Sequence, residues 1–105
     1  MRTPTTLEDI ANDVFCSVSH NVQLKLRWID ERASVELIYV PGAYRERGLA
    51  DAALARICAL ADLAGWPLIL EPSDGFGSDR GRLVRWYFRH GFAPMDGRWM
   101  LRSPR

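Results

Sequence analysis

Apolar and polar residues alternate along the first half of the chain in a way that predicts two strands. Residues 22–29 read Val-Gln-Leu-Lys-Leu-Arg-Trp-Ile, and this period of two is typical of a strand with one buried face. Residues 34–40 are more apolar, so we expect them to form a strand nearer the centre of a sheet. The residues between them, 30–33, predict a tight turn, which makes the pair a hairpin.

Three other segments repeat their apolar residues at helical spacing. Residues 5–15 predict a helix capped by a threonine, and residues 46–64 predict a long helix that ends at Gly65. Residues 82–90 predict a shorter helix that ends before Gly91. The chain is therefore expected to mix helices and strands.

The order of these elements predicts a mixed sheet. The short apolar run 68–71 follows a strand and a helix, so a right-handed crossover makes it parallel to 34–40. Residues 92–94 and 98–101 predict a final hairpin that turns through Asp96-Gly97. We therefore expect an α/β (α+β) fold with one parallel strand pair.

The composition is that of an ordinary folded domain. The 105 residues are 48% apolar and 26% charged, which suits a single domain over residues 1–105 and excludes a disordered or low-complexity chain. The longest apolar-rich stretch, 49–70, contains three charged residues, so we expect no membrane span, and no secretory signal opens the sequence. Two distant cysteines, Cys16 and Cys58, favour reduced thiols and a cytoplasmic protein.

Charge is unevenly divided, although the net charge is only +1. Residues 1–78 carry seven Lys or Arg and eleven Asp or Glu, a net charge of −4. Residues 79–105 carry seven Arg and two Asp, a net charge of +5. The basic end is either a solvated helix face or a site for an anionic ligand, and charge by itself favours the first interpretation.

The turn before the long helix carries residues suited to binding an anion. It reads Arg45-Glu46-Arg47-Gly48-Leu49-Ala50 and leads into a helix start, where the first amides have no internal partners. Gly48 lets a bulky anion approach the backbone, and Arg45 supplies a permanent charge. The pattern predicts a phosphate or pyrophosphate site that is neither a Walker A loop nor a dinucleotide-binding turn. A plain strand-to-helix turn with solvated arginines is the alternative.

Two motifs in this order resemble the GNAT superfamily of N-acetyltransferases. Arg45-Glu46-Arg47-Gly48-Leu49-Ala50 matches the family's coenzyme A signature, Gln/Arg-x-x-Gly-x-Gly/Ala. Tyr87-Phe88-Arg89-His90-Gly91-Phe92 is similar to its Leu/Phe-Tyr-x-x-x-Gly-Phe ending, and the likeness spans residues 34–95. The family commonly has an asparagine shortly before this tyrosine, where this chain reads Ser78-Asp79-Arg80-Gly81 and departs from the pattern.

The resemblance implies a GNAT-like mixed sheet with a central, splayed pair of parallel strands, two main helices and a C-terminal hairpin. Residues 1–105 would then form a single acyl-CoA-binding domain. The layout is also similar to that of very small phage acetyltransferases, one of which is a type V anti-CRISPR protein that acetylates a lysine of its target nuclease. The resemblance implies acetyl-CoA as the acyl donor and an amine as the acceptor.

By the same resemblance, backbone groups would hold the coenzyme A. The pantetheine arm would pair with the strand end at Tyr39 and Val40, where an N–H near Val40 would face the thioester carbonyl. Amides at the helix start would bind the pyrophosphate. They belong to Arg45, Arg47, Gly48, Leu49, Ala50 and Asp51.

The resemblance makes Tyr87 the candidate general acid. A phenol with a pKa near 10 is protonated at neutral pH and can give its proton to the departing thiolate, whereas a core aromatic ring is the alternative role. Glu36 is the candidate general base, and simple alternation places it on the same face as Ile38 and Val40. Glu71 is a second candidate, and an ordinary exposed carboxylate is the alternative for both acids.

The main expectation is an acetyl-CoA-dependent N-acetyltransferase, in which a primary amine such as a protein lysine or N-terminus attacks the thioester directly. Two alternatives stay open: a non-catalytic GNAT-like module that binds coenzyme A or a protein, and a small nucleic-acid-binding domain that uses the arginine-rich C-terminal part. His20 and His90 are too isolated to suggest a metal site. The C-terminal strand would permit a homodimer.

Overall fold

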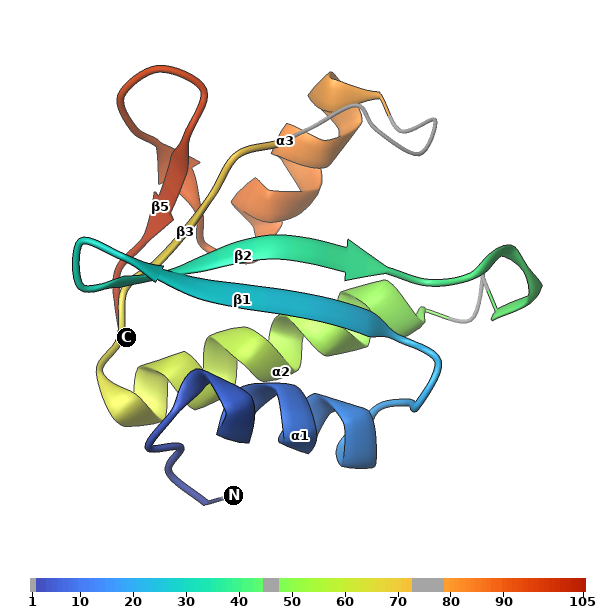
Figure 1. Cartoon of the computed structure of the whole chain (residues 1–105). Coiled ribbons are helices and arrows are strands. Elements are labelled where there is room, and N and C mark those ends of the chain that lie inside the picture. Colours follow the sequence, from blue (N-terminus) through green and yellow to red (C-terminus); the bar gives the residue numbers. More distant parts are fainter. Residues whose placement is uncertain (1, 45–47, 73–78) are drawn as a thin grey trace.

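The computed structural model describes residues 2–44, 48–72 and 79–105, which form a five-stranded mixed sheet with helices packed on it (Figure 1). The strands are β1 (Gln23–Ile29), β2 (Arg32–Tyr39), β3 (Leu68–Leu70), β4 (Ala93–Pro94) and β5 (Met100–Arg102). The helices are α1 (Leu7–Ser17), α2 (Leu49–Ala64) and α3 (Arg80–Arg89), and a short 3₁₀ helix, η1 (Gly42–Tyr44), follows β2. The strand order β1-β2-β3-β5-β4 confirms the expected α+β fold.

The hairpin of β1 and β2 turns through only two residues, Asp30 and Glu31. Their φ angles are +48° and +63°, the left-handed region that a two-residue turn of this type requires at both positions. Because the turn is so short, Ile29 lies directly opposite Arg32. Strand β2 therefore begins at Arg32, earlier than the apolar run at 34–40 predicts.

The parallel pair expected from the order of elements is confirmed. Strand β2 runs parallel to β3, and α2 makes the crossover between them. Strand β5 lies antiparallel on the other side of β3, and β4 pairs with β5 as the expected final hairpin. Strand β3 is therefore the central strand, with β2 and the C-terminal hairpin on either side of it.

The ends of the helices follow from particular residues. Thr6 caps α1 through a capping box, as the threonine-rich start predicts. Gly48 and Gly65 flank α2, both in the left-handed region, so the predicted end of this helix is confirmed. The Asp79 side chain caps α3, which begins slightly before the predicted range 82–90.

Figure 1 shows α1 and α2 next to each other on one side of the strands and α3 on the other side. Buried apolar side chains from these layers form a contiguous core. Its larger members are Ile10, Val14, Val35, Leu54, Ile57, Leu60, Leu68, Leu70, Phe92 and Met100. Full burial of one such side chain stabilises a fold by about 1.5–3 kcal/mol, so this core holds the sheet and helices together.

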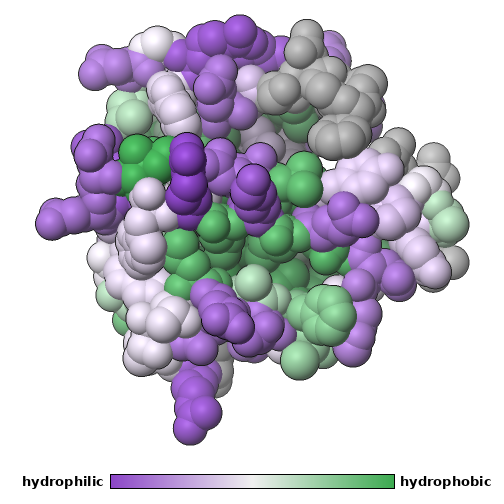
Figure 2. All heavy atoms as spheres, viewed as in Figure 1, coloured by the Kyte–Doolittle hydropathy of each residue, from purple (hydrophilic) through white to green (hydrophobic). Residues whose placement is uncertain are grey.

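The face drawn in Figure 2 has hydrophobic residues near its centre and hydrophilic residues around them. Strand β1 forms one edge of the sheet. On this strand Leu24 and Leu26 are half-buried, whereas Lys25 and Arg27 are exposed. Charged side chains on an edge strand discourage pairing with the edge of another sheet.

Candidate functional site

Strands β2 and β3 run side by side over two residue pairs and then diverge. The second pair joins Ser34 to Ile69, although β2 continues as far as Tyr39. Figure 1 shows β3 turning toward α3, while β2 continues toward the start of α2. The central parallel pair is therefore splayed, as expected. We call the point beyond Ser34 and Ile69 the splay.

The start of α2 follows the end of β2 in the chain, and its N-cap residue is a glycine. The N-cap residue, Gly48, has a φ of +69°, and no side chain of the described residues makes a capping hydrogen bond there. The N–H of Ala52 donates to the Gly48 carbonyl at 3.0 Å, so the amides of residues 49–51 have no acceptor within the helix. A Cβ on Gly48 would meet no atom within 4 Å. The described residues therefore leave the space beside Gly48 open, and a ligand there could accept hydrogen bonds from the first amides of α2.

The side chain of Asp51, in the first turn of α2, is tied to α3. Its Oδ1 accepts a hydrogen bond from Nε1 of Trp86 at 2.8 Å and lies 2.8 Å from Nε2 of His90. The contacts with His90 and then Trp86 hold the pKa of Asp51 below its ordinary value. We call these three residues the Asp51 clasp. The clasp was not predicted, because Asp51 lies 35 and 39 residues from its two partners in the sequence.

Tyr87 lies on α3 with its ring packed against the core. Its ring centroid is 4.9 Å from that of Trp86 and 5.9 Å from that of Phe92. Burial raises the pKa of the Tyr87 hydroxyl above its ordinary value. A hydroxyl that stays protonated at neutral pH meets the chemical requirement for a proton donor. The ring also packs as a core aromatic, so both roles considered for this residue are compatible with its position.

Glu36 lies at an irregularity in the β1–β2 ladder. The register shifts between Lys25 and Leu26 of β1, so that Glu36 is an additional residue of β2 and forms a β-bulge. The Glu36 carboxylate makes an ion pair of 2.7 Å with Arg27 of β1. A bulge interrupts the regular alternation of side chains and redirects the extra residue.

The expectation that Glu36 shares a face with Ile38 and Val40 is therefore wrong. Both apolar side chains pack in or against the core, whereas Glu36 forms its ion pair with Arg27, which lies opposite Ser34 on the other face of the sheet. The bulge is the physical reason, because it changes the alternation by one residue between Glu36 and Ile38. Glu71, the second candidate base, follows β3 with its side chain 46% exposed and 3.8 Å from Arg98.

The other predicted binding residues occupy the end of β2 and the start of α2, as far as they are described. Tyr39 is the last residue of β2, and Val40 follows it with 7% of its surface exposed. Residues 49–50 are half-buried in the first turn of α2. Arg45 and Arg47 lie outside the described residues.

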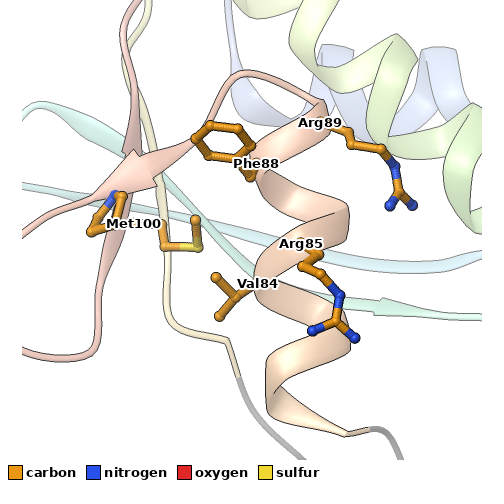
Figure 3. A pocket seen from close by; sticks show the side chains of 6 residues that line it. Val84, Arg85, Phe88, Arg89 and Met100 are labelled. Carbon is orange, nitrogen blue, oxygen red and sulfur yellow. The ribbon is translucent and has the colours of Figure 1, made fainter.

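A pocket of about 410 Å³ lies elsewhere, between α3 and the C-terminal hairpin (Figure 3). It is lined by Val84, Arg85, Phe88, Arg89, Pro94 and Met100. None of the predicted catalytic or coenzyme-binding residues lines this pocket. It is therefore a separate feature from the splay and the start of α2.

Three further observations concern the described ranges alone. No group of three or more His, Cys, Asp or Glu side chains there is placed to hold a metal ion. Helices α1, α2 and α3 are each too short or too polar to span a bilayer. Burial raises the pKa of the Cys58 thiol to about 11, so this cysteine is not a thiolate at neutral pH.

The fold and site define an α+β protein in which two central parallel strands diverge near a glycine-capped helix start. No model of a known protein family matches the chain, and no curated protein matches its sequence. Among solved structures, the fold is similar to that of the anti-CRISPR protein AcrVA5, known from a crystal structure. The TM-score is 0.61 at 20% sequence identity, over 80% of this chain and 92% of that chain. At this identity the likeness concerns the fold, and it agrees with the layout expected from the sequence.

Proposed function

We propose that the protein is an acetyl-CoA-dependent N-acetyltransferase of the GNAT type that acts on a primary amine. The observation that carries the proposal is the divergence of β2 and β3 near a helix start that no side chain of residues 2–44, 48–72 or 79–105 caps. Beyond the splay, residues 35–38 of β2 have no pairing with β3. The edge of β2 that β3 no longer pairs with can form hydrogen bonds with an amide-containing arm. The first amides of an uncapped helix can bind a phosphate. Coenzyme A combines these two groups in one molecule.

In this proposal the pyrophosphate lies over the first turn of α2. The amides of residues 49–51 donate to its oxygens, and the absence of a Cβ at Gly48 leaves room for it. Arg45 and Arg47 precede this turn in the sequence and add permanent positive charge. The pantetheine arm follows the end of β2 at Tyr39 and Val40, which directs the thioester toward the splay.

The transfer needs one attack and two proton movements. The amine nitrogen bonds to the thioester carbonyl carbon, and the resulting oxyanion collapses as the carbon–sulfur bond breaks. Tyr87 gives its hydroxyl proton to the departing thiolate, since a phenol is protonated at neutral pH. Glu36, held by Arg27, takes the proton that the attacking amine loses, either directly or through a water molecule.

The acceptor that suits this site best is an amine on a protein. Neither Tyr87 nor Glu36 lines the described pocket, so the proposal does not place an enclosed metabolite there. A lysine side chain or an N-terminus can reach an open site from another molecule. Because AcrVA5 is an anti-CRISPR protein, proteins of CRISPR systems belong among the acceptors to be assayed.

Titration calorimetry with acetyl-CoA tests the proposal on the wild type and two glycine variants. Gly48 and Gly97 have φ angles of +69° and +65°, and a Cβ on either would meet no atom within 4 Å. Gly48→Ala and Gly97→Ala therefore add similar backbone strain, about 1–2 kcal/mol each. We expect Gly48→Ala to weaken acetyl-CoA binding about tenfold, since lost or lengthened hydrogen bonds to a charged group are worth about 1.5–3 kcal/mol. Gly97→Ala should bind like the wild type.

Mass spectrometry of acceptor proteins incubated with acetyl-CoA then tests the chemistry. We expect a mass increase of one acetyl group on a lysine or N-terminus, and free thiol released in equal amount. No binding heat at millimolar acetyl-CoA would contradict the whole proposal. Binding without acetyl transfer to any acceptor would support the non-catalytic module instead.

A further inference from the structure

The pocket between α3 and the C-terminal hairpin is apolar inside and open to solvent. Val84 and Phe88 of α3 face Met100 of β5 across it, as Figure 3 shows. Phe88 is 65% exposed, the largest exposed fraction among the bulky apolar side chains of the described residues. A large aromatic ring left in water next to an apolar hollow is characteristic of a surface that a partner covers.

The three consecutive aromatic residues of α3 do not share one environment. Trp86 and Tyr87 are half-buried against the core, and Trp86 is also held by Asp51. Phe88 alone of the three points outward. Two of these rings therefore pack against the core, whereas Phe88 contributes little to the packing of the described fold.

Positive charge borders the pocket on one side. Arg85 and Arg89 contribute to the lining, but Figure 3 shows their side chains leaving α3 on the side that faces away from Met100, so their guanidinium groups lie beside the apolar hollow and not in it. Both side chains are exposed, and neither forms an ion pair with a described residue. The wider segment, residues 79–105, has a net charge of +5. A partner that enters the pocket and extends across α3 would therefore meet the positive charge of Arg85 and Arg89, of which Arg89 also interacts with the carboxylate of Asp51.

We propose that this pocket is a docking site for a protein segment that presents an apolar side chain flanked by Asp or Glu. The apolar side chain would cover Phe88 and enter the hollow above Met100, and the carboxylates would pair with Arg85 and Arg89. Guanidinium groups pair with carboxylates through two parallel hydrogen bonds, which would set the direction of the segment. This proposal is independent of acetyl transfer, because none of the pocket residues is a proposed catalytic or coenzyme-binding residue.

A nucleic acid fits the same surface less well. Binding of single strands relies on successive bases stacking on several exposed aromatic rings, and α3 exposes only Phe88. Such proteins also carry strong overall positive charge, whereas this chain has a net charge of +1. An apolar hollow offers no partner to phosphates or to the polar edges of bases.

Fluorescence anisotropy tests the proposal with a pool of short labelled peptides, in which glutamates flank a central leucine, isoleucine or phenylalanine. We expect saturable binding that weakens with added salt, and weaker binding by a matched pool with glutamine in place of glutamate. Phe88→Ala should weaken binding at least about tenfold, as loss of a central aromatic contact does in other interfaces. Leu63→Ala, which shortens a 46% exposed apolar side chain of α2, is the matched control and should bind normally.

The charge requirement is tested with arginine variants on the same helix. The double variant Arg85→Gln/Arg89→Gln should weaken binding and reduce its dependence on salt, whereas Arg82→Gln, outside the pocket lining, should have a smaller effect. The proposal is overturned if no peptide of the pool binds, or if Phe88→Ala binds as the wild type does. It is also overturned if a single-stranded oligonucleotide displaces the peptides at lower concentration. A dimer of this chain that Phe88→Ala abolishes would identify a second copy as the occupant instead.

Discussion

The surroundings of Tyr87 and Asp62 shift the pKa values of these two side chains in opposite directions. Burial without a charged partner disfavours the phenolate of Tyr87 and raises its pKa. Asp62 is also partly buried, but Arg102 donates to both of its carboxylate oxygens at 2.6 and 3.0 Å, and this lowers its pKa. The same fold thus keeps one group protonated and the other ionised at neutral pH. The first suits proton donation and the second suits a structural ion pair.

Replacing Tyr87 by phenylalanine tests the proton donor. The variant keeps the ring that packs against Trp86 and Phe92 and removes only the hydroxyl. We expect the rate of acetyl transfer to fall about 10²–10⁴-fold, the usual contribution of a general acid or base, with the Kd for acetyl-CoA unchanged. Single-turnover thiol release and calorimetry measure the two quantities separately. An unchanged rate would assign Tyr87 to packing alone.

The Asp62–Arg102 pair should make stability depend on acid pH. Because Arg102 lowers the folded-state pKa of Asp62 below its unfolded value, the pair stabilises the fold above about pH 4. That contribution is lost as the pH falls through the lower folded-state pKa. Replacing Asp62 by Ala leaves Arg102, whose side chain is only 7% exposed, without its partner. We expect a loss of about 3 kcal/mol at neutral pH, measured by urea unfolding, and a smaller loss in acid.

The pair of Glu71 and Arg98 is the control for this prediction. Its side chains are 46% and 61% exposed and 3.8 Å apart, so solvent screens the interaction. Glu71→Ala should change the free energy of unfolding by less than about 0.5 kcal/mol. Equal effects of the two substitutions would mean that Arg102 finds another partner when Asp62 is removed.

Ion pairs and hydrogen bonds between helices fix how the three helices sit relative to one another. The Asp51 clasp joins the first turn of α2 to α3, and the pair of Asp13 and Arg56 joins α1 to α2. The two links use different residues of α2, Asp51 and Arg56, so each can be removed while the other stays. The clasp also connects the proposed pyrophosphate site with the helix that carries Tyr87.

Replacing Asp51 by Ala should loosen α3 and leave α1 unaffected. Trp86 and His90 lose their acceptor, so we expect faster amide hydrogen exchange over residues 80–89. The expected loss in the free energy of unfolding is about 1 kcal/mol, that of a typical hydrogen bond. Asp13→Ala should show the reverse pattern, with faster exchange over residues 7–17 only. Identical exchange patterns in the two variants would show that the helices do not respond to these links separately.

Much of the element layout could be predicted from the sequence, because it depends on local periodicity and on Gly and Thr at helix ends. The parallel pairing of β2 and β3 followed from the order of elements and the handedness of crossovers. The start of β2 was missed, because Asp30 and Glu31 both adopt positive φ, which side chains of this kind rarely do. The bulge at Glu36 was missed for a similar reason, since a shift of register depends on the partner strand.

The candidate site was only partly predictable for the same physical reasons. Gly48 could be singled out, because a glycine at a strand-to-helix turn indicates a backbone conformation that other residues rarely adopt. The roles of Asp51, Trp86 and His90 depend on contacts between residues distant in sequence, which spacing does not reveal. The exposure of Phe88 was also unpredictable, because three aromatic residues in succession do not reveal which of them packs on the core.

At the scale of the whole molecule, helix α3 has an inward surface that packs on the core and an outward surface that borders the pocket. Its inward residues, Trp86 and Tyr87, pack on the core, and Trp86 also contacts the start of α2 through the Asp51 clasp. Its outward residue, Phe88, borders the pocket against the C-terminal hairpin. The two surfaces can be tested independently, because different residues of the helix form them.

Thermal unfolding with acetyl-CoA links the proposed site to the stability of the whole fold. A ligand that binds only the folded state stabilises it by about 2.7 kcal/mol at a concentration of about 100 times its Kd. For a chain of this size, that corresponds to a rise in Tm of about 10 °C or more. We expect this rise for the wild type and Gly97→Ala, and a smaller one for Gly48→Ala at the same concentration. Hydrogen exchange should slow at the start of α2 and the end of β2 and stay unchanged in α1. Protection confined to α1, or an equal rise in Tm for all three proteins, would place the ligand away from Gly48.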